Sequence, residues 1–339
     1  MSIFRYSPQR GFSLIELMIA LVLGLLVTLA ASNVFLSSRQ SYRTNAAISQ
    51  IQENSRITFG LLSRDLRQAR LTGCGNLNTT VNDLNTNATT GVFDWYTDFA
   101  SNGLIGYDGA GADTNPALTT GTRSSNHVTG TDNLTLIGVG GLSYSLTTTY
   151  APAVGLQIAE ASPNLGPGDL VVVCDPAQAD IVQISGINGA GYMLQRGIGS
   201  PGNANDIVHT YIASKTLVSP LQSVTWYIGC NPLTALACDP AQGGTSLYRL
   251  TAVGVTRSVS VTTQAQEMVR GVSALDFTYH QRGTSAFTDA NSIASWSPTV
   301  IDAVRIHLTF VGHNTRSTSG TPITRSLSTV VTLRNPPLN

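Results

Sequence analysis

The chain has 339 residues, which is enough for one long helix together with one or two β-rich domains. Charged residues make up only 11% of it, below the ~25% of ordinary soluble domains, and neutral polar residues take their place, as suits a secreted surface. The formal net charge is zero, so no basic footprint favours binding to nucleic acid.

A short basic leader precedes a long apolar segment. Residues 1–11 carry Arg5 and Arg10 and no acid, and residues 12–36 contain a single ionisable side chain, Glu16. As a helix the apolar segment is about 37 Å long, which is enough to span a bilayer. The two arginines predict a cytoplasmic N-terminus, so everything after residue 37 is expected to be periplasmic or extracellular. A plain signal anchor is the alternative that this pattern leaves open.

The junction between leader and helix is the most specific motif in the chain. The order Arg10-Gly11-Phe12-Ser13-Leu14-Ile15-Glu16 resembles the class III signal of type IV pilins and pseudopilins. In that family a prepilin peptidase cuts after the glycine and methylates the new first residue. The resemblance implies that cleavage follows Gly11 and that Phe12 is the N-methylated mature N-terminus. It also implies that Glu16 acts in assembly, and an acid inside a membrane span does call for a partner.

The sequence predicts that one helix continues well beyond the membrane, over residues 12–71. No proline occurs between Pro8 and Pro116 to interrupt it. One side of the later half carries an apolar stripe of Ile48, Ile51, Ser55, Phe59, Leu62, Leu66 and Ala69, while the arginines Arg56, Arg64, Arg67 and Arg70 lie largely off it. Glycines at 73 and 75 are expected to end the helix.

Residues 72–339 are expected to form a β-rich globular domain, which gives an α+β fold with an antiparallel sheet. Residues 76–130 are predicted to form loops and short strands, with an aromatic group at Phe93, Trp95 and Tyr96. Trp95 and Tyr96 are expected to pack against the helix, and an exposed adhesive patch is the alternative. Later segments alternate apolar and polar residues or form short apolar runs, which is typical of strands. These segments are residues 134–139, 170–174, 181–184, 192–195, 221–228, 304–310 and 323–333.

The four cysteines predict two disulfides. An even number in an exported chain is typical of disulfides, although four cysteines allow three pairings. Cys230 and Cys238 bracket a short segment that is expected to form its own closed loop, which leaves Cys74 to pair with Cys174. No Cys-x-x-Cys spacing favours zinc instead.

Enzyme and cofactor motifs give little support for catalysis. The glycine-rich residues 197–202 fit the letters of a dinucleotide loop, but no amphipathic helix follows to hold a pyrophosphate. The histidines are scattered, at positions 127, 209, 280, 307 and 313. Asp108, Asp113 and Asn115 offer oxygen ligands for calcium, although such acidic loops are usually solvated turns. The sequence therefore predicts neither an enzyme nor a required cofactor or metal.

Three further segments resemble PilW-type minor pilins. They are residues 62–69 with the following Gly-Cys-Gly turn, residues 246–249, and residues 267–279, which are expected as one strand. The resemblance implies a subunit in the inner membrane and then in a type IV pilus. Its expected partners are other minor pilins, the major pilin, a tip adhesin, the prepilin peptidase and the inner-membrane assembly platform. The J-type pseudopilin of type II secretion, and a membrane-anchored binding protein or enzyme, remain as alternatives.

Overall fold

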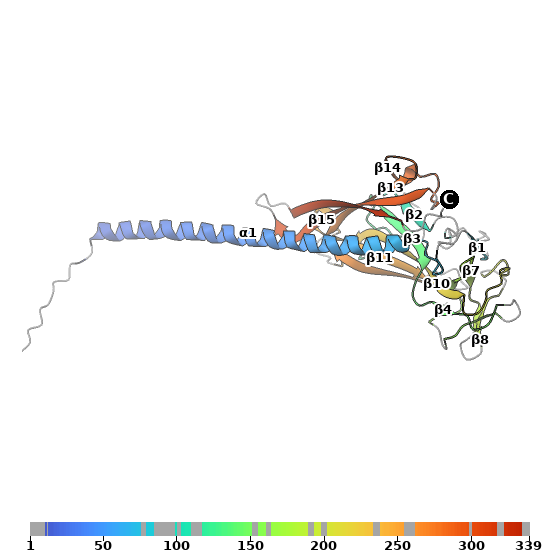
Figure 1. The fold of residues 1–339 in the computed structure, drawn as a ribbon. Coiled ribbons are helices and arrows are strands. Elements are labelled where there is room, and N and C mark those ends of the chain that lie inside the picture. Colours follow the sequence, from blue (N-terminus) through green and yellow to red (C-terminus); the bar gives the residue numbers. More distant parts are fainter. Residues whose placement is uncertain are drawn as a thin grey trace, which may run out of the picture.

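The computed structural model describes residues 11, 13–75, 79–84, 99, 103–109, 117–150, 155–160, 164–188, 193–197, 202–232, 238–253, 262–297, 300–316 and 322–333. These residues form one long helix followed by sheets whose strand pairs are antiparallel except for one parallel pair, so the fold is α+β as predicted (Figure 1). Phe12 and the aromatic group at residues 93–96 lie outside the described residues.

The helix α1, Leu14–Gln68, has two halves with different surroundings. Its N-terminal half projects away from the rest of the molecule (Figure 1), and its large apolar side chains from Leu14 to Leu36 are exposed. Its C-terminal half packs against the strands β15 (Ile301–Arg316), β16 (Pro322–Thr332) and β12 (Thr262–Arg270). The helix therefore joins an apolar extension to a packed core.

The buried face of the C-terminal half differs slightly from the predicted stripe. Ile48, Phe59 and Ala69, which the periodicity placed on it, are only half-buried. The fully buried side chains are Ala47, Ile51, Ser55, Thr58, Leu62, Asp65 and Leu66. Arg56, Arg64 and Arg67 are exposed, as the sequence predicts. Hydrophobic periodicity could not predict that Thr58 and Asp65 are buried, because both side chains are polar.

The helix also ends three residues earlier than predicted, at Gln68. The backbone of Ala69 is extended, and Arg70 has a left-handed φ of 60°. The Arg70 N–H donates to the carbonyl oxygen of Ile137 at 2.8 Å, and the Val139 N–H donates to that of Leu71 at 2.9 Å. Hydrogen bonds to a distant strand therefore take over from the helix before the glycines at 73 and 75 are reached.

The largest sheet has nine strands. Six lie in the order β1-β7-β6-β10-β11-β12, with β2, β3 and β4 attached through β10 and β3. Their bounds are β1 Thr80–Asn82, β2 Leu104–Tyr107, β3 Asn133–Val139, β4 Tyr144–Ser145, β6 Leu170–Cys174, β7 Ala179–Gln183, β10 Leu217–Cys230, β11 Thr245–Val253 and β12 Thr262–Arg270. The first part of β10 pairs with β6 and its later part with β3, while β11 lies along its other edge. The long strand β10 therefore connects the distal region of the molecule, which contains β6 and β7, to the part of the large sheet that packs against α1.

Two smaller sheets complete the fold. One has the order β14-β13-β15-β16, and the other β5-β9-β8. Their bounds are β13 Val272–Gln281, β14 Phe287–Asp289, β15 Ile301–Arg316, β16 Pro322–Thr332, β5 Leu156–Gln157, β8 Gly186–Asn188 and β9 Met193–Gln195; the short 3-10 helices η3 and η4 span Pro240–Gln242 and Ala290–Ser292. Each segment that the sequence predicted as a strand, from 134–139 to 323–333, has a strand at its place.

The segment 267–279, expected as one strand, is two. It breaks at Gly271 into β12 and β13, which belong to different sheets. Gly271 has a φ of +73°, and a Cβ added there would lie 2.7 Å from the carbonyl oxygen of Val311. Only glycine fits this turn without strain. The break directs the chain from the large sheet to the four-stranded sheet.

The described residues form one main apolar core and three smaller ones, of which the smallest contains Tyr227, Tyr248 and Leu250. The main core joins Leu62 and Leu66 of α1 to Trp226, Phe277 and Phe310 of the two larger sheets. A second core, which includes Tyr211, lies under the three-stranded sheet, and a third includes Phe99. The helix therefore contributes directly to the core that holds the two larger sheets together.

Candidate functional site

The start of α1 carries the motif residues. Ser13 is the N-cap with an extended backbone, and its N–H donates to Glu16 Oε2 at 3.3 Å. Gly11 is exposed, and Phe12 lies outside the described residues. The Ser-x-x-Glu spacing of residues 13–16 is the signature of a capping box, in which the glutamate satisfies an otherwise free backbone N–H. Sequence reasoning missed this local partner of Glu16, although the spacing was present.

No other part of the described chain covers the N-terminal half of α1. It is long and apolar enough to cross a membrane, and none of its most apolar window is buried. Leucine, isoleucine and valine side chains remain more than half exposed along this stretch, including Leu14, Leu25 and Val34. Apolar surface of this extent requires either lipid or another protein to cover it.

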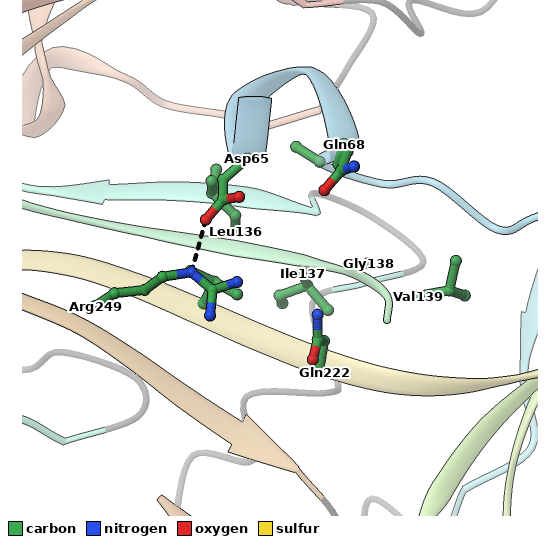
Figure 2. Close-up of a pocket in the computed structure, with 10 residues that line it drawn as sticks. Asp65, Gln68, Leu136, Ile137, Gly138, Val139, Gln222 and Arg249 are labelled. Carbon is green, nitrogen blue, oxygen red and sulfur yellow. Dashed lines mark hydrogen bonds and ion pairs between the residues drawn. The ribbon is translucent and has the colours of Figure 1, made fainter. Parts of the chain in front are cut away.

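At the other end, a buried ion pair fixes α1 to the sheet. Asp65 Oδ2 accepts a hydrogen bond from Arg249 Nε of β11 at 2.8 Å, and Figure 2 shows the two side chains pointing toward each other. The same oxygen accepts from Trp226 Nε1 of β10 at 3.2 Å, and Arg64 Nε donates to the other oxygen at 3.3 Å. Three donors thus satisfy a carboxylate that is only 4% exposed.

A hollow of about 30 Å³ lies next to this ion pair, between the end of α1 and β3 (Figure 2). Gln68, Ile137, Gly138 and Gln222 are among its lining residues. A space of this size accommodates about one water molecule. The ion pair attaches the end of the helix to β11 and, through Trp226, to β10.

Comparison with known proteins bears on the N-terminal segment. A family model described as the prokaryotic N-terminal methylation motif matches residues 6–32. The N-terminal segment of the chain is therefore similar to that of type IV pilin-like proteins. The match covers the leader junction and most of the exposed half of α1, and it supports a pilin- or pseudopilin-like protein of the kind that is cleaved and methylated at its N-terminus. No curated protein and no solved structure matches the chain.

The matched segment of this pilin-like chain includes Gly11, Phe12 and Glu16. The family model matches the segment as a whole and does not test single residues. Cleavage after Gly11, methylation of Phe12 and the assembly role of Glu16 therefore stay predictions. The match also fits the exposed apolar half of α1, which is suited to a membrane anchor. The motif and the anchor occupy the same stretch of the chain.

Both disulfides in the structure have the expected partners. Cys74 bonds to Cys174 across a sequence separation of 100, and Cys230 bonds to Cys238 across a separation of 8. The first bond connects the segment that follows α1 to the end of β6, and Cys174 is fully buried. The second closes a short loop at the end of β10. The first bond therefore reinforces the attachment of the helix to the sheet.

The described residues among those considered for catalysis or calcium do not form a metal site. Within the described part of the chain, no three His, Cys, Asp or Glu side chains converge on a metal site. Asp108 accepts from Asn291 Nδ2 at 2.9 Å, while Asp113 and Asn115 lie outside the described residues. Residues 198–201 of the glycine-rich loop also lie outside them, and residues 202–216 contain no helix that would support a dinucleotide.

Three of the described histidines form hydrogen bonds or ion pairs with nearby residues. His209 Nε2 lies 2.8 Å from Asp175, and His280 Nδ1 lies 2.6 Å from Asp302, whose hydrogen bond raises the pKa of His280. His127 hydrogen-bonds to Thr131, and burial lowers the pKa of its ring. These contacts account for the three rings structurally. The His313 side chain lies outside the described residues.

A buried polar group that the sequence did not reveal lies on the strand pair β1 and β7. Asp83 and Asp180 are 3% and 1% exposed, and the two strands run parallel here. Tyr211 Oη donates to Asp180, and Gln178 Nε2 donates to both of its oxygens, at 2.9 and 3.2 Å. Burial and the neighbouring Asp180 raise the pKa of Asp83 to about 7. The Asp83–Asp180 pair therefore makes this distal region sensitive to pH.

Proposed function

We propose that this pilin-like chain is a minor pilin of the PilW type that takes part in type IV pilus assembly by packing against other subunits. The observation that carries the proposal is the combination of the methylation motif with an apolar helix half that is exposed throughout. The helix would lie in the inner membrane before assembly and in the core of the fibre afterwards. No catalytic step is required of it.

Glu16 is the residue that separates a subunit from a simple tether. In the isolated chain it accepts the N–H of Ser13. In a fibre it would pair with the positively charged N-methylated amine of Phe12 on a neighbouring subunit, because opposite charges attract strongly where water is excluded. A helix that serves only as a tether has no such requirement for a negative charge.

Besides its exposed apolar N-terminal half, α1 has a second exposed face in its C-terminal half, and this face supports packing against a neighbouring subunit. A hollow of about 490 Å³ lies on this face, lined by Phe59, Gly60, Ser63, Arg64, Arg67 and Gln68. Gly60 is exposed, and no atom of the described residues lies within 4 Å of a Cβ added there. Glycine costs about 1 kcal/mol relative to alanine inside a helix. Nothing among the described residues requires that cost, whereas a neighbour approaching closely would.

The two strongest alternatives keep the same N-terminus. A J-type pseudopilin would use the helix in a secretion fibre, and a membrane-anchored binding protein or enzyme would never enter a fibre. The buried ion pair between Asp65 and Arg249 favours a helix rigidly held by its globular part, which suits a subunit better than a flexible tether. The residues that resemble the PilW type at 62–69 and 246–249 contain the two members of this pair.

The test is complementation of a strain that lacks this chain, with sheared surface pili probed for the protein. Two variants separate charge from capping: Glu16→Leu removes both, whereas Glu16→Gln retains an oxygen that accepts the Ser13 N–H. We expect both to insert in the membrane at normal levels and neither to restore piliation. Full piliation with Glu16→Gln would contradict the pairing with a methylated amine, and absence of the wild-type chain from pili would favour the tether.

A further inference from the structure

The segment that directly follows the apolar part of α1 is basic and aromatic. Arg39, Tyr42 and Arg43 are all exposed, and Tyr42 is 76% exposed. The Arg39 guanidinium carbon lies 5.4 Å from the centre of the Phe35 ring, so this arginine leans back toward the apolar end of the helix. Their spacing of three and four residues places all of these side chains along one side of the helix.

The length of the helix places this segment at the membrane surface. From Leu14 to Leu36 the helix rises about 34 Å, slightly more than the ~30 Å hydrocarbon core of a bilayer. Arg39 lies about 4.5 Å beyond Leu36 and Arg43 about 10 Å beyond it. The headgroup layer extends roughly 5–7 Å from the core on each side. Since long arginine side chains reach back toward this layer, both guanidinium groups can enter it.

The local charge is entirely positive. The sequence contains no acidic residue between Glu16 and Glu53. Among the described residues, no ion pair involves Arg39 or Arg43. Membrane topology gives no reason for these arginines, because the positive charges that orient a span lie on its cytoplasmic side. Their position on the exit side therefore requires another explanation.

We propose that Arg39, Tyr42 and Arg43 form a binding site for the phosphate of an anionic phospholipid in the leaflet through which the helix exits. A guanidinium group can donate two parallel hydrogen bonds to a phosphate, and tyrosine is enriched at the level of the headgroups. The site would fix the depth of the helix in the membrane before assembly. It holds equally for a pilus subunit, a secretion-fibre subunit or a tether, and so does not depend on the proposed function.

The test compares lipid preference in bilayers that contain the full-length protein. Spin-labelled phosphatidylglycerol and spin-labelled phosphatidylcholine are introduced separately at trace levels in a phosphatidylcholine bilayer, and the fraction immobilised at the protein is measured by electron paramagnetic resonance. The variant carries Arg39→Gln and Arg43→Gln. A matched control carries Arg56→Gln and Arg67→Gln, exposed arginines of the same helix that lie about 30 Å and 46 Å beyond Leu36.

We expect the wild-type chain and the control to prefer phosphatidylglycerol equally, and the Arg39/Arg43 variant to lose at least half of that preference. Each basic residue near the surface strengthens attraction to anionic lipid by about fivefold. Arg5 and Arg10 are present in every protein compared, so they contribute equally. An unchanged preference in the Arg39/Arg43 variant would overturn the proposal. Full preference with Arg39→Lys and Arg43→Lys would also overturn it, because diffuse charge would then suffice without guanidinium geometry.

Discussion

Asp65, near the end of α1, and Arg249, in the middle of β11, form an ion pair across a sequence separation of 184, with 2.8 Å between Asp65 Oδ2 and Arg249 Nε. Their side chains are 4% and 20% exposed, and the buried Trp226 donates to the same carboxylate oxygen. The pair therefore connects the helix to two strands of the large sheet at once.

Removal of the Asp65 carboxylate is expected to destabilise the folded protein strongly. Asp65→Ala leaves Arg249 and the Trp226 N–H without their partner, and breaking a buried pair in this way costs about 3–5 kcal/mol. Asp65→Asn should cost less because its oxygen still accepts from Trp226. Thermal unfolding in detergent measures both. Arg64→Ala serves as the control, because Arg64 is 58% exposed and should change stability little. Equal stability of Asp65→Ala and Arg64→Ala would show that the pair does not hold the helix.

The Asp83–Asp180 pair predicts that stability falls as the pH rises. The pKa of Asp83 is raised from 3.8 to about 7, so the folded state binds this proton more tightly than the unfolded state. The resulting stability is fully present below about pH 4 and is lost as the pH rises through 7. Its size is up to roughly 4 kcal/mol. We expect Asp83→Asn to flatten the decrease in unfolding temperature between pH 5 and pH 8.

Glu160→Gln provides the control for this titration, because Glu160 is an exposed acid in the same distal region. It should leave the pH profile of the wild-type protein unchanged. An Asp83→Asn profile that matches the wild type would mean that Asp83 does not hold this proton in the folded state.

The two disulfides should contribute unequally. On the chain-entropy estimate, the bond across the separation of 100 contributes up to ~4.7 kcal/mol, and the bond across the separation of 8 somewhat under ~3 kcal/mol. We therefore expect Cys174→Ser to lower the amount of exported protein more than Cys238→Ser. Immunoblots of the exported fraction would measure this. Peptide mapping that finds a bond between Cys74 and Cys230 would contradict the pairing itself.

Processing after Gly11 is the prediction closest to the family motif. The intact mass of the mature protein should correspond to a chain that begins at N-methyl-Phe12. Gly11→Val should leave the precursor uncut, because a β-branched side chain is a poor fit where the smallest residue is required. Gly24→Ala, at an exposed glycine within α1, should be processed normally. Normal cleavage of Gly11→Val, or a mature start at another residue, would rule out this site.

Gly60 offers a way to test the second exposed face of α1 without harming the subunit. Gly60→Ala and Gly60→Leu should both stabilise the helix, by about 0.5–1 kcal/mol, since no described atom obstructs a side chain there. If a neighbouring subunit packs into the hollow, Leu should reduce piliation while Ala reduces it less. The measurement is the amount of sheared pili at equal membrane levels. Undiminished piliation with Gly60→Leu would show that this face stays free in the fibre.

The sequence by itself determined the features that depend on local pattern. The apolar run, its arginines and the spacing from Gly11 to Glu16 predicted the exposed N-terminal half of α1 and the methylation motif. Alternating residues located the strands, because period two appears within a single segment. The short spacing of Cys230 and Cys238 left one plausible partner for Cys74, and the structure contains both bonds.

Only the tertiary structure decided the features that depend on distant residues. The helix ends at Gln68 because Arg70 and Leu71 bond to β3, and the segment 267–279 divides at Gly271 because the chain must pass close to Val311. Asp65 is buried because Arg249 and Trp226 meet it there, and Asp83 is paired because β7 runs beside β1. Each of these features depends on a contact between residues far apart in the sequence. Such a contact stabilises the fold but produces no periodic pattern in the local sequence.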